Sequence, residues 1–202
     1  MNLYIPTTVF IMIILSGCAT LQVPEDKVFP FRASFEGTAV IDGEEHAFQG
    51  AMKMVSSTSA FAQVYGPAGI TLYSVNASQD LLIVNDMWGK PLKKEALPQD
   101  GFLRLLAGLP PDSPYIWKST EDRGSRLIFH WGTLILDRFL LPLDLDVRTT
   151  PAIHAAFLRD GRTITLMMTR GSDKVVLTMQ VLEGGRWEYG ISLDEKGESL
   201  KP

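Results

Sequence analysis

From Phe31 onward, apolar side chains recur at every second position of the chain. Phe31, Ala33 and Phe35 alternate with polar or charged neighbours, and the alternation continues to Ile41. A second stretch, from residue 46 to residue 56, repeats this pattern. A period of two is typical of a β-strand that buries one face and leaves the other in water. The alternation therefore predicts a fold built mainly from antiparallel β-strands.

Short segments rich in glycine, proline or aspartate separate the alternating stretches. Asp42-Gly43 and Gly66-Pro67-Ala68-Gly69 are two examples, and such sequences favour turns between neighbouring strands. The same reasoning predicts further strands over residues 60–65, 70–75, 81–84, 115–119, 126–131, 133–139, 143–148, 162–169, 174–182 and 186–193. This order predicts a mainly β (α+β) chain with one strongly curved antiparallel sheet or a barrel.

One segment follows a helical period instead. The alternation breaks at residues 98–101, and four apolar residues then follow with helical spacing, namely Phe102, Leu105, Leu106 and Leu109. Asp100 is a suitable N-cap, and Gly108 followed by two prolines is a suitable end. We therefore predict one short helix over residues 101–109.

A long sheet that curls has an inner face, and the inward positions of this chain are rich in methionine and aromatic residues. The candidates to line an apolar, ligand-binding cavity are Phe35, Met52, Met54, Met168, Leu177, Met179, Trp187 and Tyr189. Methionine is flexible and polarisable, which suits a surface that must fit varied apolar ligands. The same residues would serve equally well in a filled hydrophobic core, so both interpretations stay open.

The only cysteine of the chain follows an apolar run near the N-terminus. Val9 to Leu15 are mostly large and apolar, and Ser16-Gly17-Cys18 come next. This order is typical of a bacterial lipoprotein signal, in which residues 1–17 are removed and Cys18 carries lipid. The run is shorter than the about twenty residues that a membrane-spanning helix needs. A plain signal peptide and a short membrane helix are the alternatives.

Residues 18–30 are expected to form the lipidated cysteine and a tether to one domain over residues 31–202, because they show no periodic apolar face. Ala19 follows the cysteine, which favours the outer membrane, with the domain facing the periplasm. The chain has a formal net charge of −4 and no basic cluster. This balance argues against nucleic acid as a partner and leaves the lipid anchor as the expected contact with the membrane.

The residues that could carry chemistry show no catalytic pattern. The chain has neither the Gly-x-Ser-x-Gly motif of a hydrolase nor a phosphate-binding glycine loop. His46, His130 and His154 lie far apart, without the spacing of zinc ligands. We therefore expect a protein that is not an enzyme and that uses no metal and no cofactor.

Two acidic residues share one face of the strand expected over residues 143–148. Asp144 and Asp146 alternate there with Leu143 and Leu145. Such a carboxylate pair could act in general acid–base catalysis. The alternation also fits a strand whose leucines point inward and whose aspartates lie on the solvent-exposed face. We favour this interpretation.

The chain contains, in this order, Gly66-Pro67-Ala68-Gly69, Leu106-Ala107-Gly108-Leu109-Pro110 and the late segment 151–164. This order of motifs resembles the LolB family, whose members are outer-membrane lipoproteins that receive other lipoproteins from the periplasmic carrier LolA. Gly66-Pro67-Ala68-Gly69 is similar to the family's Pro-Leu-Gly loop, and Leu106-Ala107-Gly108-Leu109-Pro110 to its Leu-Gly-Leu-Pro helix ending. Residues 151–164 are similar to its late strand pair. The resemblance implies an unclosed β-barrel with a short helical lid over an apolar cavity. It also implies acyl chains of lipoproteins as ligands and a LolA-like carrier as a partner.

The resemblance makes Pro67, Ala68, Gly69 and Ile70 a membrane-facing loop. The family carries a bulky leucine where this chain has Ala68, and Ile70 lies two residues further on. The expected function is to bind acyl chains and to take part in sorting lipoproteins into the outer membrane. The alternative is a structural subunit of an envelope assembly, with a filled core and an apolar docking loop at residues 139–143.

Overall fold

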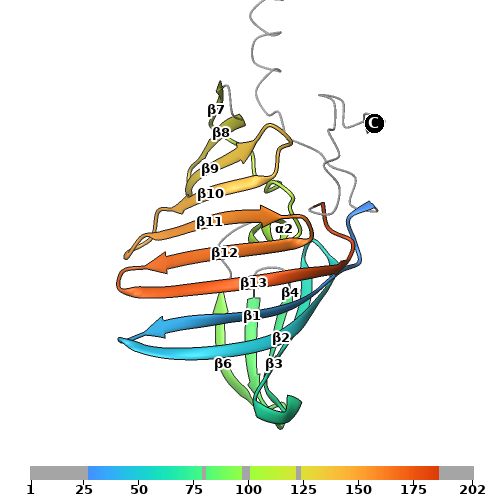
Figure 1. The fold of residues 1–202 in the computed structure, drawn as a ribbon. Coiled ribbons are helices and arrows are strands. Elements are labelled where there is room, and N and C mark those ends of the chain that lie inside the picture. Colours follow the sequence, from blue (N-terminus) through green and yellow to red (C-terminus); the bar gives the residue numbers. More distant parts are fainter. Residues whose placement is uncertain (1–26, 79–80, 97–100, 122–123, 187–202) are drawn as a thin grey trace, which may run out of the picture.

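The structure is a computed structural model that describes residues 27–78, 81–96, 101–121 and 124–186. These residues form a single antiparallel sheet of 13 strands with one short α-helix (Figure 1). The strands are β1 (Phe31–Ile41), β2 (Glu44–Ser56), β3 (Ser59–Tyr65), β4 (Thr71–Ser78), β5 (Leu81–Asp86), β6 (Pro91–Ala96), β7 (Trp117–Glu121), β8 (Gly124–Phe129), β9 (Gly132–Asp137), β10 (Pro142–Val147), β11 (Ile153–Asp160), β12 (Thr163–Arg170) and β13 (Asp173–Glu183).

The sheet consists of two meanders joined in the middle. Its order is β6-β5-β4-β3-β2-β1-β13-β12-β11-β10-β9-β8-β7, so the only neighbours not consecutive in sequence are β1 and β13. The edge strands β6 and β7 lie at opposite ends of this order, and the sheet of the described residues is not closed. The sheet curves so that β1, β2, β12 and β13 run across the view of Figure 1 while β3, β4 and β6 run downward. The expected unclosed, mainly β architecture is confirmed.

The period-two pattern located the N-terminal strands closely. β1 has the bounds that the alternation predicts, and β2 begins two residues earlier than expected. β6 was not predicted, because all six of its residues, Pro-Leu-Lys-Lys-Glu-Ala, are exposed and carry no alternation. The prediction for Leu143 was wrong. Pairing with β9 is irregular between Pro142 and Asp144, so Pro142 is buried and Leu143 is 40% exposed.

The helix is shorter than expected. α2 spans only Phe102–Leu106, and its N-cap is Gly101, at a φ of 118° and with no side-chain capping bond. The expected cap, Asp100, lies outside the described residues. The amide of Leu109 donates to the carbonyl of Arg104 at 2.9 Å, which closes the turn after the helix. In the part of the chain that the structure describes, no helix is long and apolar enough to cross a bilayer.

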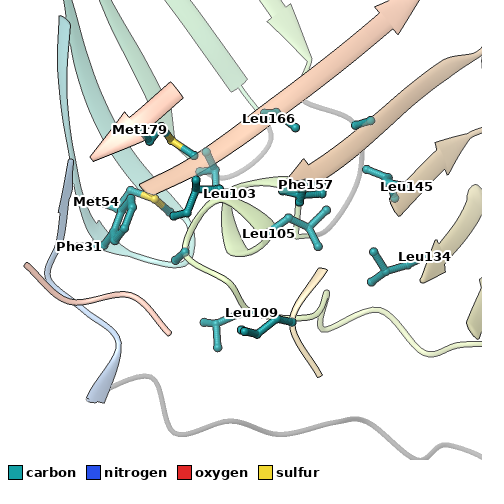
Figure 2. Close-up of a cluster of buried hydrophobic side chains, with 14 of the residues drawn as sticks. Phe31, Met54, Leu103, Leu105, Leu109, Leu134, Leu145, Phe157, Leu166 and Met179 are labelled. Carbon is teal, nitrogen blue, oxygen red and sulfur yellow. The ribbon is translucent and has the colours of Figure 1, made fainter. Parts of the chain in front are cut away.

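α2 packs into the inner face of the sheet, behind β11 and β12 in Figure 1. Leu105 and Leu109 are 1% and 0% exposed, and Leu103 points toward Met54 and Met179 (Figure 2). The guanidinium of Arg104 is also buried, where its Nε donates to the carbonyl of Pro110 at 2.9 Å. The space between this helix and the sheet is therefore filled by side chains, not by an empty cavity.

The segment expected to act as a tether takes part in this core at its end. Val28 is 3% exposed and belongs to the buried cluster. Its carbonyl accepts a hydrogen bond of 2.8 Å from the amide of Gly185, beyond the end of β13. The packed part of the chain therefore starts no later than Val28.

The sharp curvature of β1 and β2 depends on aromatic–glycine pairs. Phe35 lies opposite Gly50, and Gly37 lies opposite Phe48. A side chain at Gly50 would overlap the ring of Phe35 and the carbonyl oxygen of Gln63. The two rings, 6.3 Å apart edge to face, occupy the space that the glycines leave free. This arrangement lets the long hairpin coil without losing its apolar inner face.

Candidate functional site

The inner face is more deeply buried at one end of the strands than at the other. On β4, Ala77 is 5% exposed while Tyr73 is 44% exposed. On β1, Phe31 is fully buried while Ile41 is 47% exposed. The exposed ends share one rim of the sheet, because the β1–β2, β3–β4 and β5–β6 connections all lie there. We call this rim the open end.

Between the core and the open end lies a row of half-buried apolar residues without a covering helix. Met52, Ala62, Val75 and Val84 are direct cross-strand partners on β2, β3, β4 and β5. Val64 and Leu82 flank this row on the same face. We call these six residues the trough. Since they are only half buried, apolar surface is left for a ligand to cover.

A hollow of about 1050 Å³ lies at the open end. It forms beside the step where residues 44–48 of β2 extend past the end of β3. Its apolar lining consists of Ala39, Ile41, Ala47, Phe48, Val64, Leu72, Tyr73 and Val176. Val64 belongs to both the hollow and the trough. The hollow matches the upper end of the range of about 300–1,000 Å³ that small-molecule sites occupy.

Two connections at the open end carry large exposed apolar side chains. The β3–β4 connection contains a short 3₁₀ turn, η2 (Pro67–Gly69), in which Ala68 has a positive φ of 63°. Ile70 directly after this turn is 55% exposed. Trp88, in the β5–β6 turn, is 81% exposed beside Met87 at 49%. These three large residues project apolar surface from the rim.

The β5–β6 turn is well defined by hydrogen bonds. The Asp86 carboxylate accepts bonds from the amides of Trp88 and Lys90, both at 2.9 Å, and Gly89 takes a φ of 81°. The turn therefore presents Trp88 on a fixed backbone. Trp88 was not among the residues predicted for a site, although a tryptophan directly before a glycine, after the strand expected over residues 81–84, was visible in the sequence.

The eight predicted cavity residues divide into three groups. Met54 and Met179 are fully buried in the packed core (Figure 2). The half-buried inner-face residues, which lie where the core gives way to the open end, are Phe35, Met52, Met168 and Leu177. Trp187 and Tyr189, like the predicted lipidation site Cys18, lie outside the described residues. Whether any of them contacts a ligand stays a prediction.

The expected membrane-facing loop lies at the open end. Ala68, Gly69 and Ile70 are all exposed there. Pro67 opens the 3₁₀ turn, and Ile70 carries the only large apolar side chain of the four. The loop adjoins the hollow, since Gly66 and Leu72 on either side of it belong to the hollow's lining.

A second cluster lies on the outer face, away from the trough. His154 on β11 is the cross-strand partner of Asp146 on β10. Its Nδ1 lies 2.8 Å from Oδ1 of Asp146 and 3.4 Å from Oδ1 of Asp144. The hydrogen bond to Asp146 raises the pKa of His154, and burial raises the pKa of Asp144. His154 lies eight positions after Asp146 and ten after Asp144 in the sequence. Only the strand register brings the histidine to the two aspartates.

Comparisons with other proteins identify a fold neighbour but no family. Neither the protein-family models nor the sequences of characterised proteins match this chain. Among solved structures, the chain is similar to the LolA superfamily protein NE2245 from Nitrosomonas europaea. That similarity has a TM-score of 0.49 and 12% identity, and it covers 82% of this chain and 88% of that one. A likeness at this level carries no argument about function, which must come from the site itself.

Proposed function

We propose that this protein is a lipid-anchored protein of the outer membrane that binds acyl chains of lipoproteins in the trough. Lipid on Cys18 would hold the domain at the membrane, facing the periplasm. The protein would receive cargo from a LolA-like carrier and take part in inserting it into the outer membrane. The trough is the single observation on which the proposal depends.

The geometry of the trough suits a linear apolar ligand. The row Met52–Ala62–Val75–Val84 crosses four strands on one face, and packed side chains close it on the side of Met54 and Ala77. On the other side it shares Val64 with the hollow at the open end, whose lining also includes polar residues such as Gln49 and Thr178. An acyl chain lying there would cover apolar surface at about 0.8 kcal/mol for each buried CH₂ group. This is a binding function rather than a catalytic one.

The mechanism requires no nucleotide. Cargo would move because its acyl chains are held more weakly in the trough than in the bilayer, which buries them completely. A half-buried trough fits this requirement, since a ligand on it keeps part of its surface exposed. Ile70 and Trp88 would place the open end against the lipid, so that the chain leaves where the trough ends.

Cargo transfer tests the proposal directly. A soluble form of the protein that lacks Cys18 is mixed with a lipoprotein bound to its periplasmic carrier, and the two proteins are then separated. We expect the lipoprotein to move to this protein and its acyl chains to be retained. If no cargo moves and no acyl ligand is retained, the proposed function is wrong.

Contact with the membrane should depend on the rim. We expect Trp88→Ala in the soluble form to lower affinity for phospholipid vesicles about tenfold, because burying a large side chain contributes about 1.5–3 kcal/mol. Flotation of the protein with vesicles measures the affinity. Leu158→Ala is the matched control, since Leu158 is 56% exposed on the outer face of β11, away from the rim. Equal loss in both variants would contradict a specific role for the rim.

The filled space beneath α2 favours a second candidate function, a structural subunit of an envelope assembly. The docking loop expected at residues 139–143 is mostly packed, however. The Asp137 carboxylate accepts bonds from the amides of Phe139 and Leu141, and the guanidinium of Arg186 donates to the carbonyls of Phe139 and Leu140. Residues 139–142 are buried or half-buried, and Leu143 alone in this loop is exposed. A stable protein partner together with a total absence of acyl binding would favour this function.

A further inference from the structure

We infer that Asp144, Asp146 and His154 form a binding site for a divalent first-row transition cation on the outer face of the sheet. The three side chains come from two neighbouring strands, β10 and β11. Asp144 and Asp146 are two residues apart and so project from the same face of β10. The buried residues Leu145 and Ala155 alternate with them and face the core. The site is thus built on paired strands and lies on the opposite face of the sheet from the trough.

The three ligand atoms lie at separations close to those of a metal centre. Nδ1 of His154 is 2.8 Å from Oδ1 of Asp146 and 3.4 Å from Oδ1 of Asp144, and the ligand atoms of the three residues all fall within 4.8 Å of one another. In a tetrahedral zinc site, bonds of about 2.0–2.1 Å place neighbouring ligand atoms about 3.3 Å apart. A cation could therefore enter with small side-chain rotations and no change of the backbone.

The charge of the cluster also favours a cation. Two carboxylates face one imidazole, and the other cross-strand partners of the three residues are neutral, namely Thr133, Ile135, Ala156 and Thr169. A divalent ion would neutralise both carboxylates. The side chains of Asp146 and His154 are 65% and 50% exposed, so an ion and its remaining water ligand can reach them from solvent.

The ligand set selects the class of metal. Imidazole nitrogen suits zinc, copper, iron and nickel, whereas calcium and magnesium prefer sites made of oxygen alone. Two carboxylates and one histidine leave a position for water, as in open zinc sites. Zn²⁺ is therefore the appropriate probe, and Co²⁺ is its spectroscopic substitute.

The chain provides a matched control in its own His46. This residue lies 3.9 Å from Glu44 on the β2 strand and has an exposed side chain, 57% accessible. It is thus a surface histidine with one carboxylate neighbour. His46→Ala removes a histidine of similar exposure without touching the proposed site.

Titration of the full chain, carrying no histidine tag, with Zn²⁺ tests the inference. We expect one equivalent of Zn²⁺ whose affinity falls about tenfold or more in His154→Ala and in Asp146→Asn, because each variant removes one of three protein ligands. His46→Ala should leave this equivalent unchanged. Co²⁺ should give visible absorption bands that are lost in His154→Ala but kept in His46→Ala.

Circular dichroism of each variant establishes that the sheet is intact. Zn²⁺ binding that is absent, or that is the same in His154→Ala and the unaltered chain, would overturn the inference. In that case the cluster would be a pair of ion contacts between β10 and β11 and nothing more. Neither result bears on acyl binding, which depends on the opposite face.

Discussion

Replacing Leu105 with alanine is expected to lower the free energy of unfolding by about 2–5 kcal/mol, the cost of emptying a fully packed leucine site. Leu105 is 1% exposed and packs with Phe157 inside the curved sheet (Figure 2). The loss would be a large share of the about 5–15 kcal/mol by which native proteins are stable. Denaturant unfolding of the soluble form measures it.

Leu158→Ala provides the control for this prediction. It removes the same atoms from a side chain that is 56% exposed, and surface substitutions of this kind usually change stability by about 0.5 kcal/mol or less. A loss below about 1 kcal/mol for Leu105→Ala would show that α2 covers a loosely filled cavity after all, since cavity-forming changes in packed cores cost more.

Filling the trough should abolish most acyl binding. Ala62 lies in the middle of the trough, between its cross-strand partners Met52 and Val75. In Ala62→Trp the indole would occupy the surface that the acyl chain needs. We expect the dissociation constant for a fluorescent fatty acid to rise about tenfold or more, which corresponds to about 1.4 kcal/mol or more of lost binding energy.

The neighbouring residue supplies the control. Phe61 precedes Ala62 on β3, is 41% exposed and projects from the outer face. Phe61→Trp therefore introduces the same side chain one position away, on the other side of the sheet. It should leave acyl affinity unchanged. Equal affinity in both variants and in the unaltered protein would place acyl binding somewhere other than the trough.

The sequence predicted strand bounds and the inner face best where a strand has one solvent-exposed face and one buried face. In β1 the alternation alone gave the bounds and the inner face, because Phe31 and Ala33 pack while Arg32 faces water. β6 carries no such contrast, since it lies at the edge of the sheet and all of its residues are exposed. Period-two reasoning therefore missed this edge strand, although it located the other edge strand, β7, to within two residues.

Other features depended on register and on tertiary packing. The irregular pairing beside Pro142 turns Leu143 outward, which an ideal alternation does not foresee. The helical spacing to Leu109 predicted too long a helix, because Leu109 is buried after the chain has already turned at Gly108. The contact of His154 with Asp146 needs the pairing of β10 with β11, which a single sequence does not specify.

The trough proposed to bind acyl chains was predicted only in outline. The inward methionines were identified, but the sequence could not separate Met54, at 0% exposed, from Met52, which is half buried. The difference arises because α2 covers the end of β2 that holds Met54 and leaves the rest uncovered. Where a covering element ends is a property of the folded chain and not of the local pattern.

The position of a bound acyl chain shows whether the trough is the binding site. A fatty acid with a photoreactive group near its methyl end is mixed with the soluble form, irradiated, and its adducts are mapped by mass spectrometry. We expect saturable labelling of Met52, Ala62, Val75 and Val84, which excess unlabelled fatty acid prevents and Ala62→Trp abolishes. Labelling that does not saturate, or that falls on the outer-face residues Phe61 and Leu158, would contradict acyl binding in the trough.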